Sequence, residues 1–292
     1  ANTTASYNSA VGLSALTANT TGNRNTGLGN SAGGTITTGG YNTAVGSSSM
    51  LGATITGDDN IAIGSWHDGV VEGPLSALTS GGQNAAIGNG ALKLLTTGSA
   101  NIGIGYAAGD VITTGGQNVL VGNLCDPSAA DGTNQIVMGY NGTGSGNGTI
   151  TVADGGTDST MTLGGTTWSA PSDIRYKEDI QDEVVGLNFI NELRPVTFLW
   201  KKEKDLPKDH IAYVEGSEER TMNGIYNHGF VAQEVKEVID KYPDIKEGFD
   251  LWRVDEVEDR QRVGESALIP MLVKAVQELS AEVEQLKSKI EE

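Results

Sequence analysis

A hexad of amino acids that returns at nearly constant intervals constrains the fold of this chain more than any other feature. Each copy has an asparagine at its second position, small and apolar residues after it, and a closing glycine. The eight copies begin at Tyr7, Arg24, Tyr41, Asp59, Gln83, Ala100, Gln117 and Thr133. Their asparagines are Asn8, Asn25, Asn42, Asn60, Asn84, Asn101, Asn118 and Asn134. The intervals between these positions are therefore 17, 17, 18, 24, 17, 17 and 16, and the last copy has one extra residue. Such a period is typical of a repeat protein in which each repeat forms one structural unit.

Each hexad predicts a short strand, because its residues alternate and a glycine ends it. A second half-repeat, ITTGG at residues 36–40 and again at 112–116, predicts a second short strand. Two strands and two glycine corners per repeat describe one coil of a β-solenoid. A single coil cannot bury its thin Val/Ile face, so stacked coils or other chains must cover it. The sequence therefore predicts a mainly β region over residues 1–139, a trimeric β-solenoid or β-roll, whose asparagines form an internal ladder or cap turns rather than bind a ligand.

Charge and glycine are divided unevenly along the chain. Residues 1–168 hold 35 of the 41 glycines but only two of the 19 Lys and Arg, Arg24 and Lys93. The formal net charge is −18, and no basic cluster is present that would bind nucleic acid. Cys125 is the only cysteine, which excludes an intrachain disulfide and a cysteine-based zinc site. No apolar run reaches the roughly 18 residues of a membrane span, and neither a cofactor nor a metal is expected.

The longest interval, from Asn60 to Asn84, marks an insertion between Ser65 and Gly82. It contains Trp66, His67 and Asp68, residue types that are rare in the repeats. A loop that projects from a rigid stack is a common place for a binding contact. These three residues are therefore candidates for receptor contact, although a tolerated surface insertion explains them equally well.

The composition changes near residue 170. Residues 140–171 keep Gly and Thr, and the strand-like segments 149–153 and 160–163 predict a β-rich stem that leads to residue 172. Residues 172–292 have an ordinary globular composition. There the sequence predicts a helix over 184–193, a strand over 196–200, a polar loop or hairpin over 201–224, and a helix that ends near residue 241, before Pro243.

A heptad pattern marks the last helix, over residues 268–292. The a positions hold Ile269, Val276, Val283 and Ile290, and the d positions hold Leu272, Leu279 and Leu286. Charged residues flank this seam, which predicts a parallel coiled coil. β-Branched residues at a with leucine at d favour two strands, and this conflicts with the trimer that we expect from the rest of the chain.

Four segments of the C-terminal region belong together: residues 172–180 (SDIRYKEDI), 193–198 (LRPVTF), 228–235 (HGFVAQEV) and 268–279, which ends in KAVQEL. In this order they resemble the self-cleaving intramolecular chaperone domain of phage tailspikes and tail fibres, the endosialidase type. The hexads similarly resemble the Asn-x-x-Ala-Ile-Gly repeats of trimeric adhesin heads and of phage tail fibres, with a longer period. The resemblance implies an α+β domain over 172–292 that trimerises, helps the preceding fibre to fold and is then released by self-cleavage.

The same resemblance implies the site of cleavage. The scissile bond would be Pro171–Ser172, and Ser172 and Lys177 would form a catalytic Ser-Lys dyad. Asp173, Arg175 and His228 would support them by positioning groups or by stabilising the oxyanion.

The chemistry of this pair can also be argued from the residue types. A serine hydroxyl becomes a nucleophile when a base takes its proton, and a lysine amine is such a base where burial lowers its pKa. The two residues are five apart, whereas neighbours on one helix face are three or four apart. They must therefore meet through a turn, or Lys177 of one chain must serve Ser172 of another. Without the resemblance, Ser172 and Asp173 would indicate a helix N-cap, and His228 a packed or capping residue.

These observations together predict part of a phage tail fibre, a host-binding shaft or tip followed by a serine endopeptidase that acts once, on its own chain. We expect a homotrimer, a host cell-surface receptor (a glycan or a protein), and contact with other tail proteins through a segment that precedes Ala1. Nucleic-acid binding and membrane insertion are not expected. The fibre would belong to the virion, and the chaperone domain would be released in the host cytoplasm after assembly. Alternatives are a fibre domain that trimerises without cleavage, a trimeric adhesin-like binding protein, and a polysaccharide-degrading tailspike. Glycosidases use paired carboxylates, and here these would have to come from scattered acids such as Asp58, Asp59 and Asp68.

Overall fold

The computed structural model describes residues 3–66, 72–245, 249–255 and 260–291. It divides into two compact units, Ala1–Lys177 and Glu178–Glu292. Each unit has a hydrophobic core of its own.

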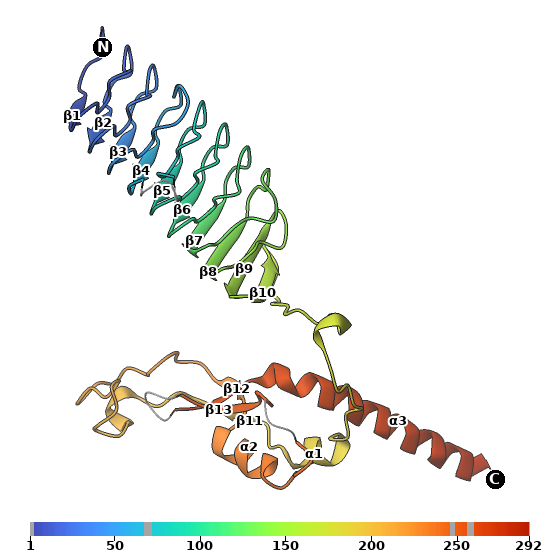
Figure 1. The fold of residues 1–292 in the computed structure, drawn as a ribbon. Coiled ribbons are helices and arrows are strands. Elements are labelled where there is room, and N and C mark those ends of the chain that lie inside the picture. The colour runs from blue at the N-terminus through green and yellow to red at the C-terminus, as the bar shows by residue number, and fades with distance from the viewer. Residues whose placement is uncertain (1–2, 67–71, 246–248, 256–259, 292) are drawn as a thin grey trace. The chain divides into compact units, whose positions relative to one another are not determined.

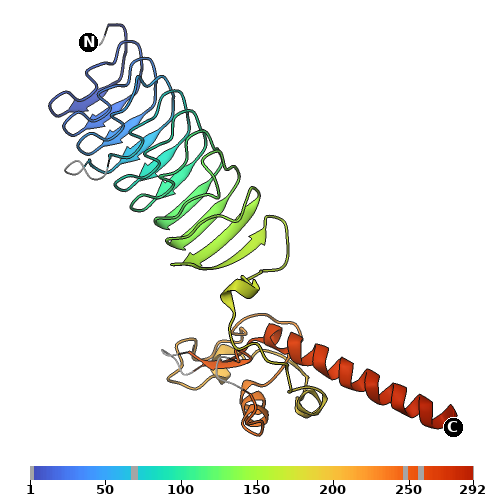
Figure 2. The ribbon, with the colours of Figure 1, turned by 45° about the vertical axis from the view of Figure 1, so that its right-hand side comes forward.

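The first unit is a β-solenoid whose ten strands form one sheet. Its first eight strands come one from each hexad, and each pairs in parallel with the strand of the next coil. They are β1 (Ser9–Val11), β2 (Thr26–Leu28), β3 (Thr43–Val45), β4 (Ile61–Ile63), β5 (Ala85–Ile87), β6 (Ile102–Ile104), β7 (Val119–Asn123) and β8 (Ile136–Tyr140). β9 (Thr149–Asp154) continues the parallel series and turns back into its antiparallel partner β10 (Thr157–Thr162). The strands follow one another along the solenoid in sequence order (Figures 1 and 2), so the predicted β-solenoid is confirmed.

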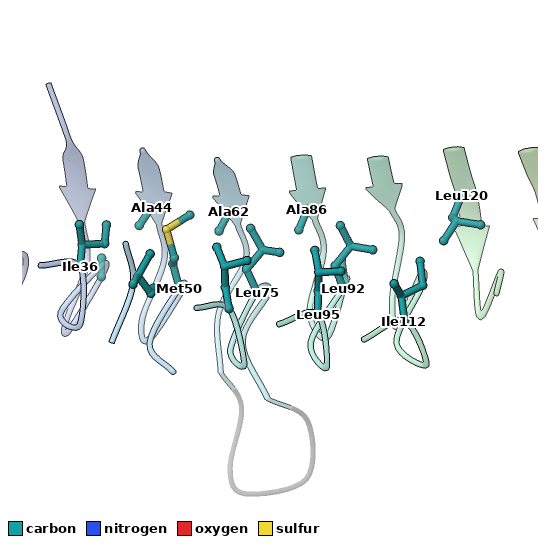
Figure 3. Close-up of a cluster of buried hydrophobic side chains, with 14 of the residues drawn as sticks. Ile36, Ala44, Met50, Ala62, Leu75, Ala86, Leu92, Leu95, Ile112 and Leu120 are labelled. Carbon is teal, nitrogen blue, oxygen red and sulfur yellow. The ribbon is translucent and has the colours of Figure 1, made fainter. Parts of the chain in front are cut away.

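The middle residue of each central strand points into the coil, and its two neighbours point outward. Ala62 is fully buried, whereas Ile61 and Ile63 beside it are 41% and 39% exposed. Larger apolar side chains from the turns fill the rest of the interior, so that one file of packed side chains runs along the stack (Figure 3). They include Ile36, Met50, Leu75, Leu92, Leu95 and Ile112. Neighbouring coils therefore share one continuous core, as in other solenoids.

A ladder of buried asparagines runs through the coils. The side-chain oxygen of each accepts a hydrogen bond from the backbone N–H of its counterpart one coil further on: Asn42 N donates to Asn25 Oδ1 at 2.9 Å, and Asn101 N donates to Asn84 Oδ1 at 3.0 Å. The side-chain amide donates to a glycine carbonyl, as from Asn101 Nδ2 to Gly115 O at 2.9 Å. Because these bonds satisfy polar groups that water cannot reach, the predicted structural role of the asparagines is confirmed.

The prediction of a second strand in every coil is wrong. The half-repeats form turns, and among the residues that the structure describes ITTGG at 36–40 pairs only through an isolated bridge between Ile36 and Ile55. Single backbone bonds such as Thr37 N to Ile55 O, at 3.0 Å, still join the coils here. The glycines that follow turn the chain before a ladder can extend.

The spacing predicted for the last hexad is also wrong. Gln135, not Asn134, occupies the eighth rung: it is fully buried, and its backbone N–H donates to Asn118 Oδ1 at 3.0 Å. Asn134 takes the left-handed position before the rung, with a φ of 53°, as Gln117 does one coil earlier with a φ of 62°. The last interval, from Asn118 to Gln135, therefore equals the regular interval of the other coils, and the hexad has no extra residue.

The second unit packs two short helices, one long helix and two two-stranded antiparallel sheets around an apolar core. Its elements are α1 (Leu187–Glu192), β11 (Val196–Phe198), β12 (Asn227–Gly229), α2 (Ala232–Ile239), β13 (Trp252–Val254), β14 (Gln261–Val263) and α3 (Ile269–Glu291). Phe189 of α1 is fully buried at the centre and meets the rings of Tyr242 and Phe249 edge-on, at centroid distances of 5.2 and 6.2 Å. The predicted helices and strand are present with shorter bounds.

Two different faces of α3 carry apolar side chains. Met271 and Ala275 lie in the core, and Glu278 Oε2 accepts a hydrogen bond from the N–H of Leu187 at 2.8 Å, which caps the start of α1. The heptad residues instead lie on the exposed face; Leu279 is 49% exposed and Val276 62%. The coiled coil remains a prediction, because only other chains could cover this seam. No helix in the described ranges is long and apolar enough to cross a membrane.

Candidate functional site

A short turn joins the residues predicted to carry the chemistry. Residues Ile174–Tyr176 form a 3₁₀ turn whose N-cap is Asp173 and whose C-cap is Lys177. Asp173 Oδ1 accepts the backbone N–H of Arg175 at 2.9 Å, and the Lys177 N–H donates to Ile174 O at 3.1 Å. An aspartate at this position stabilises a turn by satisfying a free N–H, so Asp173 does act as an N-cap.

This turn brings Lys177 back to Ser172. Lys177 Nζ donates a hydrogen bond to Ser172 Oγ at 2.7 Å, within one chain. Of the two arrangements predicted for residues five apart, the structure therefore contains the one that uses a turn. Both side chains, and that of Pro171, are exposed in the single chain.

Arg175 forms an ion pair with the side chain of Asp173. Its Nε and Nη2 donate to the two carboxylate oxygens of Asp173 at 3.0 and 2.7 Å. These hydrogen bonds hold the pKa of Asp173 below its usual value and raise the pKa of Arg175. Asp173 is therefore a charged group that positions the turn, and it is not a proton donor at neutral pH.

The segment before the predicted scissile bond is joined to β10 by a single bridge. After β10 the chain turns and returns along that strand, where Ser169 and Thr160 form an isolated antiparallel bridge. Thr160 N donates to Ser169 O at 2.9 Å, and Ser169 N donates to Thr160 O at 2.8 Å. Pro171 lies two residues beyond this anchor. The bridge was missed in the sequence, because no composition or spacing signal marks a pairing of only one residue.

His228 belongs to the second unit. It lies on β12, pairs with Thr197 of β11, and has an exposed side chain. It borders an open hollow of about 410 Å³ that is also lined by Phe230 and Glu265. Its supporting role for Ser172 remains a prediction.

The predicted receptor residues are only partly described. Trp66 follows β4 and is 46% exposed, while His67 and Asp68 lie outside the described residues. Trp66 borders a second hollow, together with Glu72. Glu72 was not singled out from the sequence, since one acid in a polar insertion carries no signal. Within the ranges that the structure describes, no three His, Cys, Asp or Glu side chains group as metal ligands do.

The fold and the turn thus define a β-solenoid followed by a small α+β domain, with a Ser-Lys pair where the two meet in the sequence. Residues 172–244 match the model of the family described as chaperone of endosialidase, Peptidase S74. The match begins at Ser172 itself and includes Asp173, Lys177 and His228. Comparisons with curated proteins and with solved structures give no match. Residues 172–244 are therefore similar to the endosialidase chaperone family, which suggests a role in the folding and trimerisation of a tail fibre.

Proposed function

We propose that this chain is part of a phage tail fibre whose C-terminal domain assembles three chains, assists the folding of the solenoid and then cuts itself off between Pro171 and Ser172. The 2.7 Å contact between Lys177 Nζ and Ser172 Oγ carries this proposal. It joins a nucleophile to a possible base at the first residue of the matched domain. The mature product would be the solenoid, which attaches to the host surface.

The cleavage step needs only groups of the chain and one water. Lys177, in its neutral form, takes the proton of the Ser172 hydroxyl across this contact. Ser172 Oγ attacks the carbonyl carbon of Pro171, and the C–N bond breaks as the Ser172 nitrogen takes up a proton. The resulting ester joins the Pro171 carbonyl to Ser172 Oγ, and water hydrolyses it to a free carboxyl group and the original hydroxyl.

The timing of the cut would follow from burial. A lysine serves as general base when desolvation favours its neutral form, yet the side chains of Ser172 and Lys177 are exposed in the single chain. We propose that neighbouring chains cover the dyad in the trimer, so that cleavage waits for assembly. Catalysis between chains remains an alternative. Co-expressed Ser172→Ala and Lys177→Ala chains would be cut only if a dyad can form between chains, whereas catalysis within one chain leaves both intact.

Trimerisation is supported by apolar side chains that the single chain leaves in water. On the solenoid, the outward residues of the central strands form an outer apolar face, made by Ile61, Ile63, Ile87, Ile102 and Ile104, each between 37% and 41% exposed. Contiguous apolar surface of this kind usually marks an interface. The exposed heptad seam of α3 is a second such surface. Ile63→Glu with Ile104→Glu should keep the coil fold and break the solenoid trimer, as read by light scattering and circular dichroism.

The intact mass of the purified chain tests the cleavage. Wild type should give two fragments, one ending at Pro171 and one starting at Ser172. Ser172→Ala and Lys177→Met should each stay as one chain. Ser169→Ala is a matched control, because it removes a nearby serine hydroxyl and keeps the backbone bridge to Thr160. An uncut wild-type chain would favour the alternative, a fibre domain that trimerises without cleavage.

A further inference from the structure

A hollow on the surface of the solenoid lies beside the insertion. It has a volume of about 330 Å³ and is lined by Ser48, Leu51, Trp66, Glu72, Gly73 and Ser76. This volume lies at the lower end of the range of small-molecule sites, about 300–1,000 Å³. Trp66 and Glu72 both come from the insertion, and Ser48 and Leu51 come from the coil before it. The departure from the regular period is therefore what creates the hollow.

The floor of this hollow is part of the rigid stack. Trp66 N donates to Ser47 O at 2.8 Å, and Met50 N donates to Pro74 O at 3.0 Å. Gly73 passes so close to the neighbouring coil that a Cβ there would lie 2.5 Å from Ser48 O. Because backbone hydrogen bonds hold both coils, the floor of the hollow is fixed before a ligand binds, and a ligand would lose little free energy in ordering it.

The side chains around the hollow divide into an aromatic wall and a polar rim. Trp66 is the only tryptophan before Trp168, and it is 46% exposed. The rim has the hydroxyls of Ser48 and Ser76 and the carboxylate of Glu72. Ser76 Oγ lies 3.0 Å from Glu72 Oε2 and 3.1 Å from Lys93 O, and its single hydrogen is shared between these two acceptors.

The aromatic wall and the polar rim together indicate which class of ligand the hollow would bind. A sugar ring has a face of C–H groups that packs on an indole and an edge of hydroxyls that donate to a carboxylate. A purely apolar ligand would exclude water and leave the Glu72 carboxylate with no partner other than the Ser76 hydroxyl. An anionic sugar would be repelled by Glu72 and by a chain with a net charge of −18. Lys93, the nearby cation, is already paired with Asp110 at 2.8 Å.

We infer that the hollow between Trp66 and Glu72 binds a neutral, hydroxyl-rich saccharide ring of the host surface. The inference rests on the proposed attachment function, for which it names the ligand class. It does not depend on self-cleavage or on the dyad.

The test uses the full chain with Ser172→Ala, which keeps it in one piece. Saturation-transfer NMR with glucose, galactose, mannose and N-acetylglucosamine should detect binding of at least one sugar, and N-acetylneuraminic acid should not bind. Trp66→Ala and Glu72→Gln should each weaken that binding at least about tenfold, and Trp66→Phe should weaken it less. Trp168→Ala is the matched control, because Trp168 is 52% exposed but lies outside the hollow.

Two results would overturn the inference. Unchanged binding by Trp66→Ala and Glu72→Gln would show that the sugar binds elsewhere, and no binding of any neutral sugar by the parent chain would refute the ligand class. Light scattering and melting curves of the same samples report assembly and folding, and the intact mass of the wild type reports cleavage. A failure of the saccharide inference is thereby distinguished from a failure of the proposed fibre function.

Discussion

Replacement of Asn84 by alanine should weaken the solenoid at one rung of the ladder, and the structure gives the size of the effect. Asn84 is 1% exposed. Its Oδ1 accepts the backbone N–H of Asn101 at 3.0 Å, and its Nδ2 donates to Gly98 O at 3.0 Å. Alanine keeps the backbone of residue 84 and leaves both partners buried without a hydrogen bond.

Each buried polar group left without a partner costs about 1–3 kcal/mol. Two such groups give roughly 2–6 kcal/mol. For a unit of this size, 1 kcal/mol shifts Tm by about 2–4 °C, so Asn84→Ala should lower Tm by at least about 4 °C. Asn30→Ala is the matched control, because Asn30 is exposed and surface substitutions usually change stability by less than about 0.5 kcal/mol.

Far-UV circular dichroism during heating would measure this difference, with both variants made in the uncut Ser172→Ala chain. All samples need the same scan rate, since the unfolding of an assembled fibre can be irreversible. A melting point for Asn84→Ala within about 1 °C of that for Asn30→Ala would refute the view that the ladder stabilises the stack.

Three further predictions concern the site, the half-buried Asp126 and the core of the second unit. Ser169→Pro removes the N–H that donates to Thr160 O at 2.8 Å, so it should slow cleavage in a mass-spectrometric time course while Ser169→Ala does not; equal rates would show that the bridge does not position the scissile bond. Burial, and then the nearby charge of Asp110, raise the pKa of Asp126 to about 6. The folded protein therefore binds a proton at Asp126 more tightly than the unfolded chain does, and the free energy of unfolding falls as the pH rises from about 4 to about 6. Asp126→Asn should remove this loss, up to about 3 kcal/mol, and raise Tm at pH 7.5 but not at pH 4; the same gain at both pH values would contradict the assignment. Phe189→Ala should cost about 3–5 kcal/mol and, if the domain assists assembly, lower the yield of soluble solenoid trimer in gel filtration; a normal yield with an unfolded second unit would contradict that role.

The solenoid was predictable from the sequence because its decisive signals are local. A strand in each hexad follows from residues that are neighbours in the chain, and so does the glycine that ends it. The eighth rung was misassigned because an asparagine stands at 134, one position before the true rung. Only the pairing of β8 with β7, which sets Gln135 above Asn118, reveals that glutamine can occupy a rung. The prediction of a strand in the second half-repeat was wrong because apolar and threonine residues suit both a strand and an inward turn.

The chemistry of the site was predictable only in part. Ser172 and Lys177 are close in sequence, so a turn that joins them could be foreseen. The bridge between Ser169 and Thr160 depends on how the chain folds back on β10, and the hollow depends on two coils whose residues Ser48 and Glu72 lie far apart in sequence. Contacts of this kind carry no spacing signal, because tertiary pairing alone creates them.

Cleavage at Pro171–Ser172 would change what holds three chains together. Before the cut, the outer apolar face of the solenoid and the heptad seam of α3 could both contribute to the trimer. After the cut, the fragment that ends at Pro171 retains only the outer apolar face, with residues such as Ile63 and Ile104. A closed symmetric assembly must then be stable on this face alone. We therefore expect charged substitutions on the outer apolar face to matter most after cleavage, and substitutions on the seam, such as Leu279→Glu, to matter most before it. With cleavage, this division would also explain how the seam can have a dimer-like heptad pattern without deciding the symmetry of the mature fibre, because the domain that carries the seam would no longer be needed there.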